Sequence, residues 1–266
     1  MHCHQLTPGE TIDIRNLPTD GKEFCDNRKQ AEREFNELRE ELIEQQNRFY
    51  AEGKHKLLII LQAMDAGGKD STIRKVLSGV NPQGVRVQSF KAPTSHELAH
   101  DYLWRIHRVV PARGMIGVFN RSHYEDVLVV RVEKLVPKAV WQKRYSQINE
   151  FEELLSETGT KILKFFLHIS SAEQQERFQA RLDDPSKHWK FSLDDLEKRK
   201  KWDQYMEAYG EMLNRCTTKV APWHVIPANQ KWYRNLAIAK TIVEAIRGLA
   251  PRYPQTKDDL SEVVVE

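Results

Sequence analysis

The segment from Leu61 to Thr72, LQAMDAGGKDST, combines the residue types of a phosphate-binding loop. Gly67 and Gly68 permit a tight turn and a close approach of the backbone to a ligand. Backbone amides that enter a helix, together with the positive end of its dipole, bind phosphate groups. Lys69 adds a cation that can follow a transferred phosphoryl group. The segment therefore predicts phosphate chemistry.

Two positions depart from the generic P-loop, or Walker A, pattern. Ala63 stands where glycine is usual, and Asp70 replaces the hydroxyl residue that contacts a metal ion. Asp65 and Asp70 instead supply carboxylates, and Mg²⁺ prefers hard oxygen ligands. The alternative is a glycine-rich turn that binds nothing, but strand, turn, lysine and helix occur together as the motif requires. The expected phosphate or nucleotide contacts in this loop are Ala66, Gly67, Gly68, Asp70 and Ser71.

A second candidate segment is the apolar run Met115–Ser122, which predicts a buried strand with a polar carboxyl end. Sheets of α/β proteins place their ligands at that end of the strands. The planar guanidinium of Arg121 matches two phosphate oxygens. Glu125 and Asp126 follow, and we expect one or both to hold Mg²⁺ directly or through water. The alternative for these two acids is a solvated helix start, favoured by the helix dipole.

A third segment, from residue 177 to 201, is rich in basic side chains. Arg177 and Arg181 stand four residues apart, so a helix places both on one face. Asp184-Pro185 predicts the end of that helix, and Ser192 the start of a second one. Two helices around a basic loop, from about 171 to 215, resemble the lid of a nucleotide kinase, which closes over phosphates and excludes water. The alternative for Lys198–Lys201 is a solvated surface.

These three segments resemble the signature segments of the polyphosphate kinase 2 family. They are Ala63–Asp70, Phe119–Asp126, and Arg177–Arg181 followed by Asp184–Lys190. They occur in the expected order, and the resemblance extends from about residue 30 to 250. It implies a P-loop kinase fold, dependence on Mg²⁺ with Mn²⁺ as the alternative metal, and phosphoryl transfer between inorganic polyphosphate and adenine or guanine nucleotides.

The resemblance also implies roles for particular residues. Many family members have Asp before the arginine of the second segment, whereas this chain has Asn120, as in the class III subgroup that phosphorylates AMP to ADP and ADP to ATP. Phe90 and Lys91 lie in a region that approaches the nucleotide in the family, although a core position is the alternative for Phe90. We expect Arg74 and Lys75 to extend positive charge toward a long polyanion, and the alternative for both is a surface position without a ligand.

We assign the catalytic roles on this basis. Lys69 and Arg121 would act on the transferred phosphoryl group, and Asp65 would orient the nucleotide phosphate or its metal ion. Arg177 and Arg181 would close from the lid. Two other functions remain: an ATP-dependent P-loop nucleotide kinase, disfavoured by the missing hydroxyl after Lys69, and a non-catalytic polyphosphate-binding protein, which would not need the acidic metal ligands.

The elements that must position these residues alternate between strand and helix. This order predicts an α/β fold: a doubly wound parallel sheet with helices on both faces, similar to P-loop kinases, and a helical lid. A long amphipathic helix over Arg28–Glu52 either covers the core or pairs with another subunit. Capping boxes predict three helix starts, at Thr94 with Glu97, Ser170 with Glu173, and Ser192 with Asp195. The expected strands are 57–62, 85–90, 115–120, 161–169 and 223–227.

Composition narrows the class of protein. The 266 residues include 41 basic and 38 acidic side chains, so any anionic ligand must be bound by local clusters of charge. We expect an extended or loosely packed N-terminal arm over 1–27, and one domain over 28–266. The longest apolar run, Leu57–Leu61, is too short to span a membrane. The polar start and three scattered cysteines, Cys3, Cys25 and Cys216, favour the cytoplasm. We expect a homo-oligomer, a dimer or tetramer, that binds neither nucleic acid nor a membrane.

Overall fold

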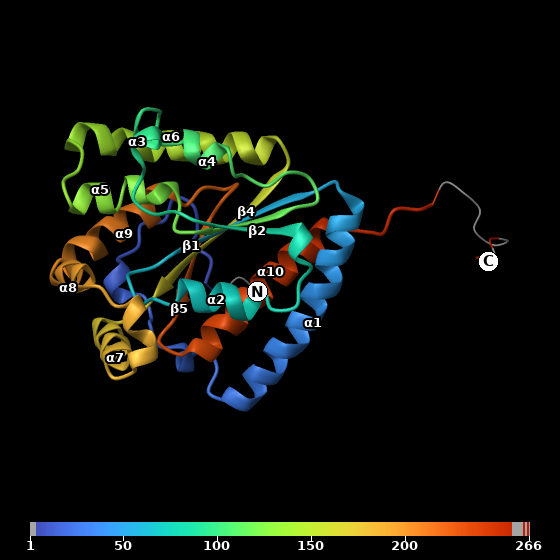
Figure 1. The fold of residues 1–266 in the computed structure, drawn as a ribbon, viewed down its shortest axis with the longest axis horizontal. Coiled ribbons are helices and arrows are strands. Elements are labelled where there is room, and N and C mark those ends of the chain that lie inside the picture. The colour runs from blue at the N-terminus through green and yellow to red at the C-terminus, as the bar shows by residue number, and fades with distance from the viewer. Residues whose placement is uncertain (1–3, 257–262, 264, 266) are drawn as a thin grey trace.

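The computed structural model describes residues 4–256, 263 and 265, so Cys3 and the outermost parts of the predicted arm and domain lie outside the described residues. The described strands form one parallel sheet in the order β2-β3-β1-β4-β5 (Figure 1). This arrangement confirms the predicted doubly wound α/β sheet. The strands are β1 (Lys56–Gln62), β2 (Val85–Ser89), β3 (Ile116–Asn120), β4 (Thr160–His168) and β5 (Trp223–Pro227).

Strand β1 lies in the middle of the sheet and is apolar on both faces. Leu58 and Ile60 pack into one hydrophobic cluster, and Leu57 and Ile59 pack into the other. Side chains alternate between the faces of a strand, so a continuous apolar run is what a doubly covered strand requires. The helices that cover the first face are α4 (Trp104–His107), α5 (Val129–Val132), α6 (Lys138–Glu157) and α9 (Trp202–Cys216), and those on the second are α1 (Arg28–Glu52), α2 (Lys69–Val76) and α10 (Lys231–Leu249).

Helix α1 has the predicted bounds. Asn27 accepts a hydrogen bond from the backbone N–H of Gln30 at its start, and Gly53 ends it with a φ of 65°. Its buried positions include Ala31, Leu42 and Phe49, and the helix packs against α10 (Figure 1). The structure thus shows α1 covering the core, while its pairing with another subunit stays a prediction.

The segment from residue 4 to 27 packs against the domain, which corrects the expectation of a loosely packed arm. It contains the short 3₁₀ helices η1 (Ile14–Asn16) and η2 (Gly21–Glu23). Ile14 is 3% exposed and belongs to the first hydrophobic cluster. Gln5 forms an antiparallel bridge with His224 of the edge strand β5. An edge strand has unpaired backbone groups, and the arm satisfies some of them.

The helix starts differ in part from the predicted capping boxes. Helix α3 (Ser95–Leu98) has the complete box of Thr94 and Glu97. Ser170 caps α7 (Ser171–Leu182), but the carboxylate of Glu173 pairs with Arg177 instead of completing the box. Ser192 caps α8 (Leu193–Lys200) through the N–H of Asp194, not that of Asp195. The remaining 3₁₀ helices are η3 (Pro82–Gly84), η4 (His123–Asp126) and η5 (Pro185–Lys190).

The predicted second lid helix is two helices, α8 and α9. Leu193 on α8 is 76% exposed, whereas Tyr209 and Leu213 on α9 lie in the core. Helix α9 therefore belongs to the body of the domain, and α7, η5 and α8 make up the outer part of the segment. Among residues 4–256, 263 and 265, none of the helices combines the length and apolar character that a membrane crossing requires.

A buried ion pair fixes the segment that follows β3. The Lys164 ammonium on β4 lies 2.6 Å from Glu152 Oε2 on α6, and neither side chain is exposed. Lys164 also donates to Tyr124 Oη at 2.8 Å, and that hydroxyl donates to Glu152 Oε1 at 2.8 Å. Burial raises the pKa of the Glu152 carboxyl, but Lys164 and His123 together outweigh this effect, and the pKa is lowered. Tyr124 lies on η4, so the network holds η4 and the neighbouring Arg121 in place.

We expect Glu152→Ala to lower the free energy of unfolding by about 3–5 kcal/mol, because it leaves the Lys164 ammonium buried without a counter-charge. Urea denaturation measures this loss. The control is Glu34→Ala, which removes an exposed pair with Lys240 and is expected to change stability by less than about 1 kcal/mol. A loss of less than about 1 kcal/mol for Glu152→Ala would contradict the anchoring role.

Candidate active site

The loop between β1 and α2 has the backbone shape that its glycines predict. Ala66 and Gly68 have φ values of 61° and 103°, in the left-handed region. A Cβ atom on Gly68 would lie 2.0 Å from Nη1 of Arg234, so only glycine fits there. The N–H of Gly67 donates to the carbonyl of Met64 at 2.9 Å and closes the turn.

Lys69 begins α2 and is held at the base of this loop. Its side chain is 8% exposed, and Nζ donates to the carbonyl oxygen of Ala63 at 2.8 Å. Burial, followed by the charge of Arg121, lowers the pKa of Lys69 to about 8. Its ammonium therefore gains from any added negative charge in the loop.

Asp65 and Arg121 join the loop to β3. Arg121 Nη2 lies 2.8 Å from Asp65 Oδ1, and the N–H of Arg121 donates to the carbonyl of Leu61 at 3.1 Å. Arg121 has a φ of 62°, and such strained backbone at a non-glycine residue is common at functional sites. Burial raises the pKa of Asp65, but Lys69 and Arg121 outweigh it and lower the pKa overall. Asp65 is thus an ionised acid between two cations.

Asn120 lies opposite Asp70. Its amide nitrogen donates to Asp70 Oδ1 at 2.5 Å. An aspartate at position 120 would instead place a carboxylate against a carboxylate, and like charges at this separation repel. The amide of Asn120 can therefore lie against Asp70 without the repulsion that an aspartate would cause.

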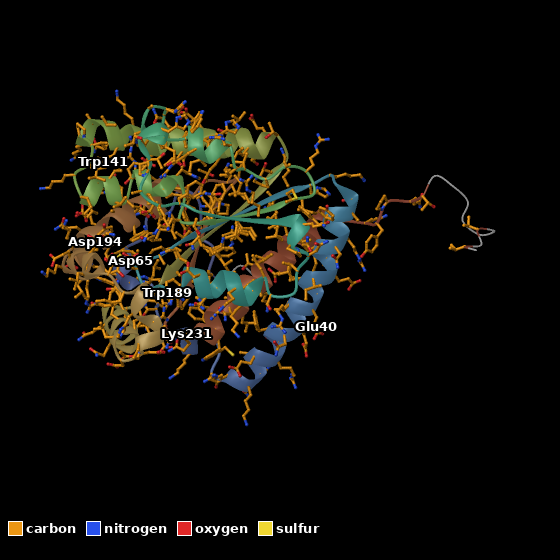
Figure 2. All side chains as sticks on the ribbon, viewed as in Figure 1. Glu40, Asp65, Trp141, Trp189, Asp194 and Lys231 are labelled. Atoms are coloured by element: carbon orange, nitrogen blue, oxygen red, sulfur yellow. The ribbon has the colours of Figure 1, made fainter. Side chains whose placement is uncertain are left out.

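These residues line a cavity of about 780 Å³ at the carboxyl ends of the strands. Figure 2 shows Trp189 and Lys231, which also line it, on the same side of the molecule as Asp65, whereas Glu40 on α1 lies away from them. The predicted site residues in its wall are Asp65, Ala66, Gly67, Gly68, Lys69, Asp70, Ser71, Phe90, Lys91, Asn120, Arg121, Arg177 and Arg181.

Three predicted residues do not line this cavity. Arg74 is exposed on the outside of α2. Asp126 accepts a hydrogen bond from Arg144 Nη1 on α6 at 2.8 Å, so its carboxylate is already paired. Glu125 borders a smaller cavity of about 30 Å³, whose wall also includes Asp65 and Arg121. Phe90 belongs to the hydrophobic core, where it packs edge-on against Phe119 with ring centroids 5.0 Å apart. It also lines the larger cavity.

Arg177 ties the lid to the loop. From α7, its Nη1 donates to the carbonyl oxygen of Ala66 at 2.9 Å, and its Nη2 to those of Ala228 at 2.6 Å and Asn229 at 3.1 Å. Its Nε pairs with Glu173 at 2.6 Å. Arg177 and Arg181 share one face as predicted, since both line the cavity. The bonds of Arg177 indicate that it positions α7 against the P-loop.

Arg181 holds the outer part of the lid together. Its Nη1 donates to the carbonyl oxygen of Lys190 on η5 at 3.1 Å and lies 3.7 Å from Asp195 Oδ2 on α8. The same side chain lines the cavity. It therefore joins η5 and α8 to the cavity wall.

Two residues that line the cavity, Lys231 and Arg234, are not among the predicted site residues. Both lie on α10, which directly follows β5. The predicted topology could have located them, because the carboxyl ends of all parallel strands meet at one edge of a sheet. Polar residues after the last predicted strand belong to the same edge as the P-loop. Lys187 and Lys190, in the predicted basic loop, and Trp189 between them also line the cavity.

The acidic residues in the cavity determine how a metal ion would fit. Within the described part of the chain, no three His, Cys, Asp or Glu side chains lie close enough together to hold a metal ion by themselves. Asp65 and Asp70 both line the cavity. Mg²⁺ is usually bound through one or two carboxylates and substrate phosphates. The donor set therefore fits a metal ion that arrives with a phosphate ligand.

Comparison with known proteins places the chain in a family. Residues 25–254 match the family Polyphosphate kinase 2 (PPK2). The chain is 52% identical over 267 residues to the AMP/ADP-polyphosphate phosphotransferase of Meiothermus ruber, covering 100% of both chains. It is 45% identical to the ADP-polyphosphate phosphotransferase of Rhodopseudomonas palustris, covering 93% of this chain and 90% of the relative.

A solved structure agrees with the sequence matches. The crystal structure of Polyphosphate Kinase 2 from Arthrobacter aurescens TC1 superposes with a TM-score of 0.91 at 42% identity, over 96% of this chain and 92% of that one. The sheet order, the loop after β1 and these matches agree with one another. This chain belongs to the polyphosphate kinase 2 family.

Proposed function

We propose that this chain transfers phosphate from inorganic polyphosphate to both AMP and ADP. As a family member it is a polyphosphate:nucleotide phosphotransferase. The observation that carries the proposal is the cavity in which Lys69 and Arg121 flank Asp65 at the end of β1. Two cations at this point neutralise charge on a phosphoryl group, and phosphoryl transfer depends chiefly on such charge and on alignment.

The proposed step needs no general base. A terminal phosphate oxygen of the nucleotide forms a bond to the last phosphorus of the chain, and the bridging P–O bond to the next phosphate breaks. The shortened polyphosphate leaves with the electrons of that bond. The attacking oxygen is already anionic, so no proton has to be removed. Lys69 and Arg121 act on the transferred group, and Asp65 keeps their two charges at a fixed separation.

The metal ion of the proposed reaction is Mg²⁺, with Mn²⁺ as the alternative. Asp65 and Asp70 are the carboxylates that would hold it, because both line the cavity. When bound, the ion neutralises negative charge on the phosphates. Glu125 remains a second candidate through water, from the small cavity beside Asp65. Asp126 is not a candidate, because it lines neither cavity and Arg144 pairs with its carboxylate.

The acceptor range rests on two observations. Asn120 donates to Asp70, so this edge of the cavity has one negative charge fewer than an aspartate would give. The missing charge reduces the electrostatic repulsion of the acceptor's phosphates, whether the acceptor is AMP or ADP. The Meiothermus ruber relative is named for both AMP and ADP. Use of guanine nucleotides, a homo-oligomeric state and a cytoplasmic location stay predictions.

Incubation of AMP or ADP with long-chain polyphosphate and Mg²⁺ tests the function directly. Chromatography should show ADP and then ATP formed from AMP, and ATP formed from ADP. Product with ATP as the donor and none with polyphosphate would replace the proposal by an ATP-dependent kinase. Binding of polyphosphate without any product would leave a non-catalytic binding protein.

We expect Lys69→Ala to lower kcat by about 10²–10³-fold, because the variant loses a preorganised charge at the transferred group. Steady-state kinetics with polyphosphate and ADP measures the change, and circular dichroism checks the fold. Lys161→Ala is the control, since Lys161 is exposed near the start of β4, at the opposite end of the strands from the cavity. Activity near that of the unmodified protein would refute the role of Lys69.

We expect KM for polyphosphate to rise as the pH increases above about 8, the pKa of Lys69 in the ligand-free protein. A bound phosphate chain favours the ammonium and raises this pKa, so binding takes up a proton above pH 8 and weakens by up to about tenfold per pH unit. In Lys69→Arg the charge persists at high pH, and the slope should disappear. An equal slope in both proteins would contradict the assignment.

We expect Arg177→Ala to lower kcat by about 10–100-fold while KM for the nucleotide changes little, because α7 loses its connection to the P-loop. Arg177→Lys should not restore the rate, since one ammonium cannot replace the fork that reaches three carbonyl groups. Gln179→Ala, an exposed change on the same helix, is the control. An increase in KM with an unchanged kcat would contradict a positioning role.

A further inference from the structure

The N-terminal arm is tightly docked on the start of α10. Its Gly21 lies so close to the ring of Tyr233 that a Cβ atom there would be 2.4 Å from Cδ1, so only glycine fits. His4 Nε2 lies 2.6 Å from Tyr233 Oη, and Phe24 stacks on the same ring with centroids 5.7 Å apart. The arm is therefore a fixed support beside the loop between β5 and α10.

Asn229, in the loop between β5 and α10, joins this arm to the lid. Its backbone N–H donates to the carbonyl oxygen of Thr19 at 3.0 Å, and its Nδ2 donates to the Thr19 hydroxyl at 3.1 Å. Its Oδ1 accepts a hydrogen bond at 3.0 Å from the N–H of Ser170, which caps α7. One side chain thus connects the arm to the first turn of the lid.

Helix α7 in turn contacts the backbone of the P-loop at two successive carbonyl groups. Gln174, which is 1% exposed, donates from Nε2 to the carbonyl oxygen of Asp65 at 2.9 Å. Arg177 donates to the carbonyl oxygens of Ala66 and of Asn229 itself. The left-handed backbone at Ala66 is strained, and strained backbone persists only where several contacts fix it. The position of α7 therefore affects the shape of the P-loop.

The residues of this connection are separate from the substrate cavity. Thr19, Ser170 and Asn229 border neither of the two cavities at the site. All three are uncharged, so they add nothing to the electrostatic binding of phosphates. Any effect that they have on the reaction must therefore pass through α7.

We propose that Thr19 and Asn229 are positioning residues for phosphoryl transfer, and that the N-terminal arm thereby supports the P-loop. The two residues hold the first turn of α7, so that Gln174 and Arg177 keep the P-loop carbonyls in place. The effect on the rate rests on the proposed function, because a displaced P-loop misplaces Lys69 against the transferred group. Misplacement by about 1 Å can lower a rate by about 10²-fold, so the loss of one hydrogen bond in this connection is measurable.

Thr19→Val removes the hydroxyl but keeps the side-chain shape and the backbone hydrogen bond with Asn229. We expect kcat with polyphosphate and ADP to fall about 3–10-fold, the effect of one lost hydrogen bond, while KM for both substrates changes less than about twofold. Thr19→Ser retains a hydroxyl and should restore kcat. Thr11→Val is the matched control, because Thr11 is an exposed threonine of the same arm. An unchanged kcat in Thr19→Val would overturn the inference.

The combination with Arg177→Ala shows whether the effect passes through α7. In that background α7 has already lost its contact with Ala66, so adding Thr19→Val should lower kcat by less than about twofold further. A further fall as large as in the otherwise unmodified protein would mean an independent route and would overturn the inference. Asn229→Ala removes the same side-chain bond from the other partner, and it replaces Thr19→Val in every comparison if that variant does not fold.

Hydrogen exchange of the ligand-free protein separates this inference from the proposed function. Backbone amides of α7 should exchange about 3–10-fold faster in Thr19→Val, whereas those of α6, which covers the first face of the sheet, should not change. This result supports the role of the arm even if the unmodified protein forms no product. Unchanged exchange in α7 contradicts that role even if turnover is normal.

Discussion

The ion pair between Asp65 and Arg121 is the interaction on which the site depends. It joins the loop after β1 to the end of β3 and places an ionised carboxylate between two cations. Without Asp65, the charges of Lys69 and Arg121 would repel each other inside a partly buried site. The strained backbone at Ala66 and Arg121 exists because the two strands fix both ends of this arrangement. The sheet therefore positions the charges before any substrate binds.

Other contacts around the cavity also fix charged groups before a substrate binds. Arg177 connects α7 to the P-loop carbonyl of Ala66, and the buried pair of Lys164 and Glu152 anchors η4 directly after Arg121. Each connection removes freedom from a group that would otherwise have to be ordered by the substrate. The net charge of the chain is only +3, yet positive charge is concentrated at one edge of the sheet. Positive charge that is clustered in this way suits a polyanionic donor better than positive charge spread over the whole protein.

Local patterns in the sequence predicted the elements and the loop, and distant contacts account for the differences. Continuous patterns of apolar spacing and capping predict β1 and α1, and a contiguous motif predicts the P-loop. Asp126 has no such local signal, because its partner Arg144 comes from α6. Lys231 and Arg234 have no motif around them and reach the cavity only through the sheet order. The break between α8 and α9 occurs where Trp202 packs against both hydrophobic clusters, which periodicity alone does not reveal.

A crystal structure of the protein with a polyphosphate chain and AMP would show directly where the transferred phosphate binds. We expect one phosphate group within hydrogen-bond distance of both Lys69 Nζ and the Arg121 guanidinium, with AMP toward β2. Separate anions at the two side chains, or a chain that bypasses Lys69, would contradict it.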